Sequence, residues 1–291
     1  MSQLLSAGTA IEEEPTPVLV LEERIRYVYS RPVSNVRQRL RIVPPPLHGR
    51  QRRRRWHLAV HGVESSRQRT FLDRFGNVTV DVSVPQVAEA VEFSLEVEAE
   101  PDGSRQVDDV VADGRYLRHT RLTAPDEALT ELARGGEHGD VASLCERVHD
   151  SILYEWGVTG VRTTASEAVA GGRGVCQDYA HIMLAACRIA GLAARYVSGH
   201  LTGEGGSHAW VEVLHPHPTR HNLSTAEGWD PTHNRRTHAG YLVVATGRDY
   251  LDAAPLSGTY EGREASNALD VDKRLELATP AGHPLGHRIR T

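Results

Sequence analysis

The feature that most constrains the fold is a change in the spacing of apolar residues near position 120. Between about residues 22 and 120, apolar and polar side chains alternate, as they do in half-buried strands. The clearest runs are Ile25–Tyr29, Trp56–Val60, Val78–Val84 and Val91–Val97. Regular alternation over about 100 residues predicts an N-terminal β-sandwich.

After residue 120 the spacing becomes helical. Apolar residues recur every three or four positions across 128–133, 141–153 and 180–187, which is typical of helices with one buried face. Alternating segments then return, and we expect strands at 194–200, 208–214, 240–245 and 269–277. Helices followed by strands predict an α+β fold, in which helices pack on an antiparallel sheet.

Local signals fix several boundaries. Gly76-Asn77 tolerates the positive φ angles of a tight hairpin. Asp140 is a suitable N-cap for the second helical segment. The turn from Gly171 to Gly174 predicts that Cys176 opens the third helix, which ends near Gly191.

The length of 291 residues fits two domains. Residues 1–20 contain Glu12-Glu13-Glu14-Pro15 and little apolar surface, so we predict a flexible tail there. The β-sandwich is then assigned to 21–120, the second and catalytic domain to 121–278, and a second flexible tail to 279–291.

The net charge of −5 argues against a nucleic-acid partner. No run of about 18 apolar residues or signal peptide is evident, so we expect neither membrane association nor export. Cys145, Cys176 and Cys187 form an odd set without paired spacing, which favours a reducing, cytoplasmic location. The basic stretch Arg50–Arg55 is either an anion-binding patch or, more commonly, a solvated edge strand or loop.

Three residues in chain order offer the groups of a nucleophilic mechanism: Cys176, His208 and Asp230. A cysteine thiol attacks as the thiolate, and its usual pKa of about 8.5 falls at a helix N-terminus or beside an imidazolium. Histidine suits the proton transfers because its pKa lies near neutrality. A buried carboxylate commonly orients such a histidine through its second N–H. These positions are therefore the predicted catalytic residues.

A zinc site is the competing interpretation of the same segment. It would use Cys176, His181, Cys187 and His208, but Cys176 and His181 lie about 140° apart around a helix and do not converge on one ion. We therefore predict no metal and no cofactor, and assign Cys145 and Cys187 to the core. Further histidines lie near a Pro-rich segment and are expected in a solvated loop: His215, His217, His221 and His233.

Several motifs resemble the bacterial transglutaminase-like superfamily. They are Gly174–Asp178, Ser207–Glu212 and Trp229 with Asp230–Thr232, and the likeness extends over nearly all of residues 22–278. The resemblance implies a papain-like core with Cys176 as nucleophile, His208 as base and Asp230 as its orienting partner. This sequence departs from the family pattern in two places: Trp229 directly precedes Asp230, and residues 216–227 resemble an insertion.

These residues predict acyl transfer at a peptide or glutamine carboxamide through a thioester, and therefore a peptide or protein substrate. Water as acceptor gives a protease, amidase or deamidase, whereas an amine gives a transglutaminase. The second oxyanion donor is open between Tyr154 and Gln177. Two other classes remain: a non-catalytic peptide-binding module of the same fold, and a metal-dependent hydrolase. The oligomeric state is not indicated.

Overall fold

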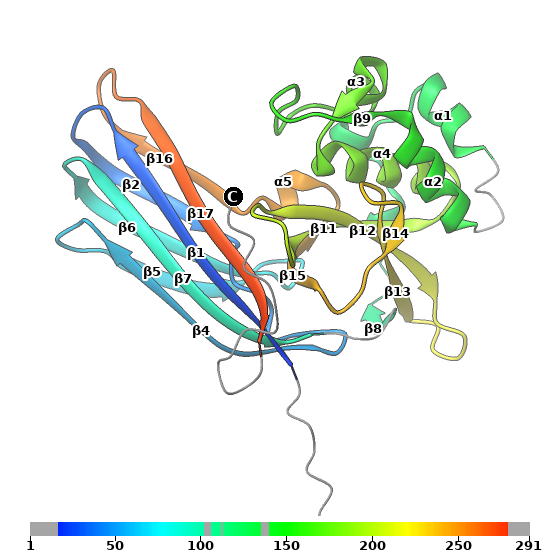
Figure 1. The fold of residues 1–291 in the computed structure, drawn as a ribbon, viewed down its shortest axis with the longest axis horizontal. Helices are drawn as coiled ribbons and strands as arrows, with labels where there is room; N and C mark the ends of the chain where they lie inside the picture. The colour runs from blue at the N-terminus through cyan, green and yellow to red at the C-terminus, as the bar shows by residue number, and fades with distance from the viewer. Residues whose placement is uncertain (1–16, 102–105, 112, 135–139, 279–291) are drawn as a thin grey trace, which may run out of the picture.

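The computed structural model describes residues 17–101, 106–111, 113–134 and 140–278. Two parts lie side by side in Figure 1. One consists of antiparallel sheets and is called the β unit below. The other combines a sheet with helices and is called the mixed unit.

The β unit contains two sheets whose buried side chains join one hydrophobic cluster. One sheet has the order β17-β1-β7-β4-β3 and the other β16-β2-β6-β5. The strands are β1 (Val18–Tyr29), β2 (Val33–Leu40), β3 (Leu47–His48), β4 (Gln51–His61), β5 (Arg67–Leu72), β6 (Val78–Val87), β7 (Ala90–Glu100), β16 (Leu256–Glu261) and β17 (Asn267–Ala278). In β1 and β7 every second side chain is buried, so the alternation in the sequence matches one buried face.

The mixed unit is built on a sheet of order β14-β13-β12-β11-β15, with β8 paired to β13. Its strands are β8 (Gln106–Val111), β11 (Ala193–Leu201), β12 (His208–Pro216), β13 (Leu223–Asp230), β14 (Arg235–Arg236) and β15 (Tyr241–Gly247). The helices are α1 (Glu127–Ala133), α2 (Val141–Ser151), α3 (Ala165–Gly171), α4 (Cys176–Ile189) and α5 (Tyr250–Ala253), and a short parallel pair joins β9 (Leu153–Tyr154) to β10 (Arg173–Gly174).

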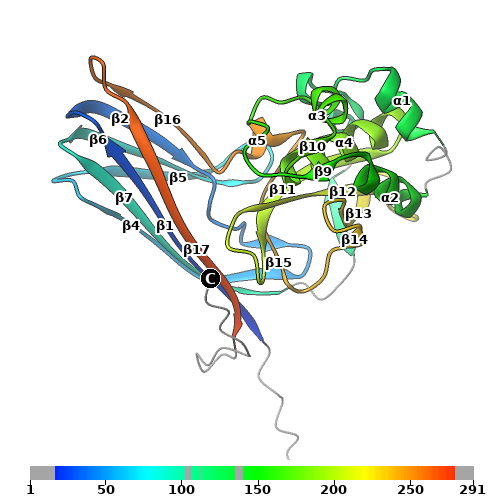
Figure 2. The same cartoon turned by 45° about the horizontal axis from the view of Figure 1, so that its top comes forward.

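Helix α4 is the centre of the mixed unit. It packs against β11 and β12 on one side and against α1, α2 and α3 on the other, and it lies between the sheet and the outer helices in Figure 2. From Asp178 to Arg188 every residue of α4 is buried. A helix buried all round is held by its neighbours, so its N-terminal residue has a fixed position relative to the sheet. Among the described residues, no helix has the length and apolar composition required to cross a bilayer.

The predicted local features agree with the structure. The hairpin from β5 to β6 turns at Gly76, whose φ is +82°. The Asp140 side chain accepts a hydrogen bond from the Ser143 amide at the start of α2, and Cys176 is the first residue of α4. The arginine-rich stretch, however, differs from the prediction of an edge strand, because it lies largely in β4, inside the two-residue edge strand β3. Its Arg54 pairs with Glu100 on the neighbouring strand β7.

The connections between the two parts differ from the prediction. Strand β1 begins at Val18, inside the segment 1–20 that was predicted to be a tail, while residues 1–16 and 279–291 lie outside the described residues. The segment 269–277, expected in the second domain, lies in β17 and pairs with β1 along its length. Strand β8 conversely joins the sheet of the mixed unit. Alternation reveals that a strand is half buried, but not which strand it pairs with.

The two units are joined by side chains that pair with the free edge of β15. The Gln51 amide donates to the carbonyl of Val243 (2.9 Å) and accepts from its N–H (2.8 Å). Asn77 makes the same two contacts with Thr246, at 2.8 Å each. These amides replace the backbone partners that an edge strand lacks, so the edge is covered without a further strand.

The Gln51 contacts predict a specific loss of stability. Replacing Gln51 with Ala leaves a buried N–H and a buried C=O of Val243 unpaired, which should lower the free energy of unfolding by about 2–4 kcal/mol. Urea denaturation measures this change. The exposed Gln68 of β5 provides the matched control, since Gln68→Ala should cost less than about 0.5 kcal/mol. Equal losses in the two variants would contradict the proposed role of Gln51.

Candidate active site

The N-terminus of α4 is shaped by Gly174 and Asp178. The Asp178 carboxylate Oδ2 accepts from the Val175 amide (2.8 Å) and from the Thr159 hydroxyl (2.6 Å). A Cβ on Gly174 would come within 2.8 Å of that same carboxylate oxygen, so glycine is required there. This arrangement fixes the turn that presents Cys176, and it explains the sequence order Gly-Val-Cys-Gln-Asp.

Cys176 therefore occupies the first turn of a buried helix while its own side chain remains partly accessible. The first amides of a helix have no acceptor within the helix, so the Cys176 and Gln177 N–H groups are available to an incoming oxygen atom. The positive end of the helix dipole also favours negative charge at this position. The location suits a thiolate and the oxyanion that its attack would generate.

His208 opens β12, and Asp230 ends β13. Their side chains meet in a hydrogen bond of 2.7 Å from His208 Nε2 to Asp230 Oδ2. Both side chains are almost fully buried. The structure thus brings together the predicted histidine and its predicted carboxylate partner.

The Asp230 carboxylate is the most heavily hydrogen-bonded group in this region. Oδ2 also accepts from the Tyr241 hydroxyl (2.6 Å) and from His233 Nδ1 (2.7 Å). Oδ1 accepts from the Thr232 and His233 amides (3.0 and 3.3 Å). Burial alone would raise the pKa of Asp230, but His208 and these other donors hold it well below its usual value. The residue is therefore a charged carboxylate held in one orientation.

The imidazole of His208 responds to that carboxylate and to the cysteine. Burial opposes its charge, yet Asp230 and the Cys176 sulfur together raise the pKa of His208 to about 10. Since Nε2 is committed to Asp230, Nδ1 is the nitrogen that faces the thiol side. The site favours an imidazolium beside the sulfur, which is the pairing expected for a reactive thiolate.

Aromatic rings hold the imidazole in place. The indole of Trp210 stacks on it at 6.0 Å between ring centroids, and Tyr241 packs edge-on against that indole at 5.2 Å. Gly199 lies opposite His208 on β11, and a Cβ there would come within 2.6 Å of the Trp210 ring. Glycine at this position thus makes room for the tryptophan that fixes the histidine.

Glu212 links this strand to the β unit. Its carboxylate pairs with Arg195 on β11 (2.6 Å) and with His48 on β3 (2.7 Å). Burial opposes the charge of Glu212, but these partners lower its pKa to about 2. The last residue of the Ser-His-Ala-Trp-Val-Glu motif is therefore structural, and it holds β12 against the β unit.

Two residues at the site were not predicted. His233 was expected in a solvated loop, but its side chain contacts Asp230 and, through Nε2, the Glu204 carboxylate at 3.1 Å. Glu204 reaches His208 Nδ1 at 3.3 Å with its other oxygen. The position of His233 three residues after Asp230, just beyond a Pro-Thr turn, is the signal that could have suggested its contact. No local pattern indicated Glu204, because the contact depends on how its glycine-rich loop folds back.

The residues that could act as metal ligands are held together by hydrogen bonds. His208, Asp230 and His233 bring ligand atoms within 4.8 Å of one another. However, the nitrogen–oxygen separations are 2.7 Å, and the shared carboxylate oxygen also accepts from Tyr241. The other residues of the zinc alternative lie elsewhere: His181 accepts from the Tyr250 amide, and Cys187 is fully buried in the core.

The two candidates for the second oxyanion donor behave differently. The Gln177 side-chain amide donates to the Gly160 carbonyl at 3.2 Å, which directs it away to the neighbouring loop. The Tyr154 side chain is largely exposed, and burial first, then the nearby Cys176 and Glu204, raise its pKa. Tyr154 is consequently the candidate whose hydroxyl lies in the electrostatic field of the sulfur.

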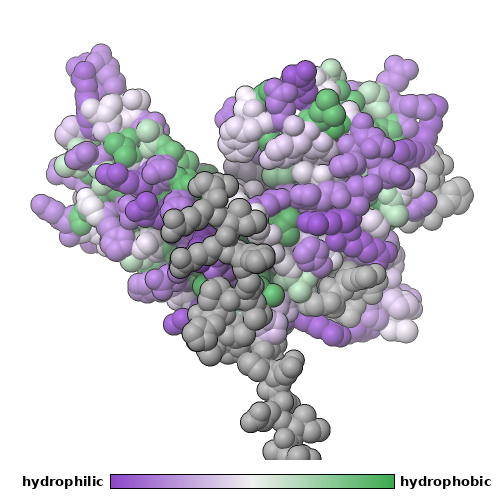
Figure 3. Space-filling model, in the orientation of Figure 1, coloured by the Kyte–Doolittle hydropathy of each residue, from purple (hydrophilic) through white to green (hydrophobic). Residues whose placement is uncertain are grey.

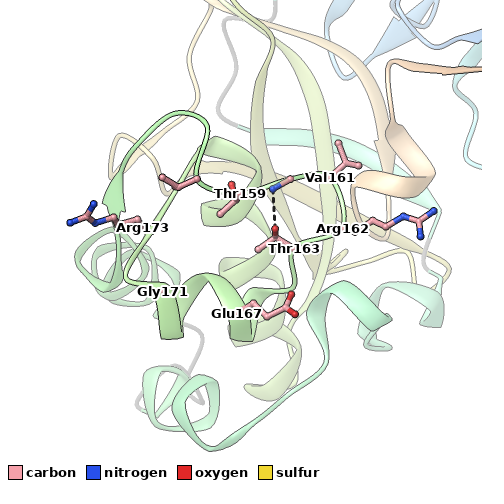
Figure 4. Close-up of a pocket in the computed structure, with 9 residues that line it drawn as sticks. Thr159, Val161, Arg162, Thr163, Glu167, Gly171 and Arg173 are labelled. Atoms are coloured by element: carbon pink, nitrogen blue, oxygen red, sulfur yellow. Dashed lines mark hydrogen bonds between the residues drawn. The ribbon is translucent and has the colours of Figure 1, made fainter. Parts of the chain in front are cut away.

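The loop that receives Gln177 borders a pocket of about 680 Å³. Figure 4 shows Thr159 and Thr163 facing the interior of this loop, where the Gly160 amide donates to the Thr163 hydroxyl at 3.0 Å. Arg162 and Arg173 extend outward on opposite sides. Because Thr159 and Gly160 both contact residues of the first turn of α4, the pocket adjoins the cysteine end of that helix.

The chain matches two family models. The core of the transglutaminase-like superfamily matches residues 118–231, and the bacterial transglutaminase-like N-terminal region matches residues 20–100. The chain belongs to the transglutaminase-like superfamily. The matched core of this superfamily contains Cys176, His208 and Asp230.

Individual relatives agree with this assignment. An uncharacterized protein of Mycobacterium leprae is 30% identical over 86% of this chain and 95% of its own length. An uncharacterized protein of Mycobacterium tuberculosis is 35% identical over 50% of this chain and 47% of its own length. Among solved structures, a Cytophaga hutchinsonii protein described as a candidate cysteine protease has a TM-score of 0.67 at 20% identity, covering 94% of this chain and 92% of that chain. This last likeness establishes a shared fold.

Thiol labelling should distinguish the three cysteines. Cys145 and Cys187 are fully buried, and burial raises the pKa of each to about 12, whereas Cys176 is partly accessible. Iodoacetamide at neutral pH should therefore alkylate Cys176 alone in the native protein, as peptide mass spectrometry would show. All three should react after denaturation. Comparable native labelling of Cys145 or Cys187 would contradict the described packing.

The charge of His208 is also testable. Because its folded pKa of about 10 exceeds the ordinary value of 6.5, its charge pairing stabilises the fold fully below pH 6.5, and this contribution is lost as the pH rises through about 10. NMR of the imidazole nitrogens should show His208 protonated at neutral pH. In Asp230→Asn the pKa should fall by at least about one unit, since a principal stabilising charge is removed. An unchanged titration in that variant would refute the role of Asp230.

Proposed function

We propose that this protein is a cysteine enzyme that transfers or hydrolyses the acyl group of a peptide or glutamine carboxamide. The observation that carries the proposal is the 2.7 Å hydrogen bond between His208 and Asp230. The same imidazole interacts with the sulfur of Cys176 at the start of α4. Membership of the transglutaminase-like superfamily supports this chemistry. We also interpret the two sheets of the β unit as a β-sandwich, and place the reaction in the cytoplasm.

Each residue has a defined role in the proposed cycle, and His208 acts first as acid and then as base. The Cys176 thiolate attacks the carbonyl carbon, and the first amides of α4 donate to the resulting oxyanion. The His208 imidazolium then gives its Nδ1 proton to the departing ammonia or amine, leaving a thioester. Asp230 keeps the ring oriented through Nε2 and stabilises its positive charge. Water or an amine, deprotonated by His208, finally releases the acyl group.

Mass spectrometry of a glutamine-containing peptide tests this proposal. With the enzyme alone we expect cleavage or deamidation, and with an added primary amine we expect an amine adduct. Cys176→Ala should lose product formation by a factor of at least about 10³, since the nucleophile is absent.

Cys187→Ala is the matched control, because Cys187 lies within the core, eleven residues after Cys176 along α4. It should retain product formation. Equal activity of Cys176→Ala and the unmodified protein would overturn the proposal. Tight peptide binding without any conversion, in both proteins, would instead support a binding module of the same fold.

A further inference from the structure

The carboxylate of Glu204 lies where a reaction partner of the thioester must approach. Its two oxygens lie 3.3 Å from His208 Nδ1 and 3.1 Å from His233 Nε2. The Nε2 atom of His208 is occupied by Asp230, so every proton transfer at the sulfur passes through Nδ1. Glu204 is therefore the acidic group beside the nitrogen that performs the proposed chemistry.

Microscopic reversibility fixes the position of the acceptor. The leaving ammonia takes its proton from Nδ1, and the attacking acceptor must return a proton to the same nitrogen. The acceptor consequently binds beside Nδ1, within reach of the Glu204 carboxylate. The Glu204 carboxylate attracts an ammonium group bound there and forms a charge-assisted hydrogen bond with it, whereas a water molecule carries no charge to pair with the carboxylate.

The support around Glu204 indicates that its placement is specific. His233 contacts a Glu204 carboxylate oxygen through Nε2 and the Asp230 carboxylate through Nδ1. His233 therefore connects Glu204 to Asp230, the carboxylate that orients His208. The Glu204 side chain is about one-third exposed, at 35%. It is thus open to solvent and to an incoming molecule. A Cβ added at Gly203, Gly205 or Gly206 would meet no atom within 4 Å, so the surrounding loop leaves open space.

We propose that Glu204 is a specificity-determining residue that selects primary alkylammonium acceptors, such as a lysine side chain, over water. This inference rests on the proposed acyl-transfer function and names its second substrate class. The described part of the molecular face drawn in Figure 3 is largely hydrophilic, with scattered apolar side chains.

The proposed step balances without a further reagent. The alkylammonium gives one proton through Glu204 to solvent and becomes a neutral amine. Its nitrogen attacks the thioester carbon, the carbon–sulfur bond breaks, and the electron pair returns to the Cys176 sulfur. The second proton passes from nitrogen to His208 Nδ1, which restores the imidazolium and leaves a secondary amide.

The test compares product ratios within single reactions. The full-length protein is incubated with a glutamine-containing peptide and cadaverine, and mass spectrometry measures the ratio of amine adduct to hydrolysed product. Glu204→Gln keeps the size of the side chain but removes its charge, and should lower this ratio by about tenfold or more. Glu131→Gln on α1 is the matched control, because Glu131 is exposed and pairs with the neighbouring Arg134 and not with a residue of the site, and its ratio should equal that of the unmodified protein.

A neutral acceptor tests whether the effect of Glu204 depends on charge pairing with the acceptor. Hydroxylamine is uncharged at mildly alkaline pH, so its adduct-to-hydrolysis ratio should be the same in Glu204→Gln and in the unmodified protein. An unchanged cadaverine ratio would overturn the proposal, as would an equal fall with both acceptors. A higher total rate in Glu204→Gln at a constant product ratio would also overturn it, since Glu204 would then only restrict access to the site. Absence of every acyl product in the unmodified protein would instead refute the underlying function.

Discussion

The site depends on one buried carboxylate. A fully buried charge is tolerated only when donors compensate for its lost hydration, and Asp230 receives them from His208, His233, Tyr241 and the turn that follows it. These donors come from β12, from β15 and from the segment after β13. Satisfying the carboxylate therefore requires that three strands of the sheet be correctly registered. The same interactions that compensate the charge also fix the imidazole, so fold and chemistry share one requirement.

The β unit supports this arrangement from the other side. Gln51 and Asn77 cover the edge of β15, and His48 holds Glu212 on β12. Helix α4 packs on the same sheet and presents Cys176. Strand β12, which carries His208, thus lies between α4 and a contact from the β unit. Such confinement limits movement of His208, which the proposed proton transfers over hydrogen-bond distances would require.

Much of this was predictable from local sequence. Cys176 at a helix start and His208 at the start of a strand were inferred from chemistry and spacing, and the structure places each on the expected element. Asp230, predicted as the carboxylate partner of the histidine, ends β13. The pairing of β17 with β1 was not predictable, since alternation specifies burial but not the partner strand. His233 and Glu204 were missed for a related reason. A polar residue in a loop has no periodic signal, and its contacts arise only when distant segments meet.

The residues of this site fall into two groups: the buried His208 and Asp230, and the partly exposed Glu204 and His233 in loops. Nε2 of His208 is committed to Asp230, so in the proposed cycle Nδ1 serves the sulfur, the leaving group and the acceptor in turn. Nothing in the cysteine, histidine or aspartate distinguishes water from an amine, because each role is identical for both acceptors. The proposal therefore assigns the discriminating groups to the open side of Nδ1, where Glu204 and His233 lie. Under this proposal, acceptor choice depends on the loops around the sheet, and the proton transfers depend on the buried residues.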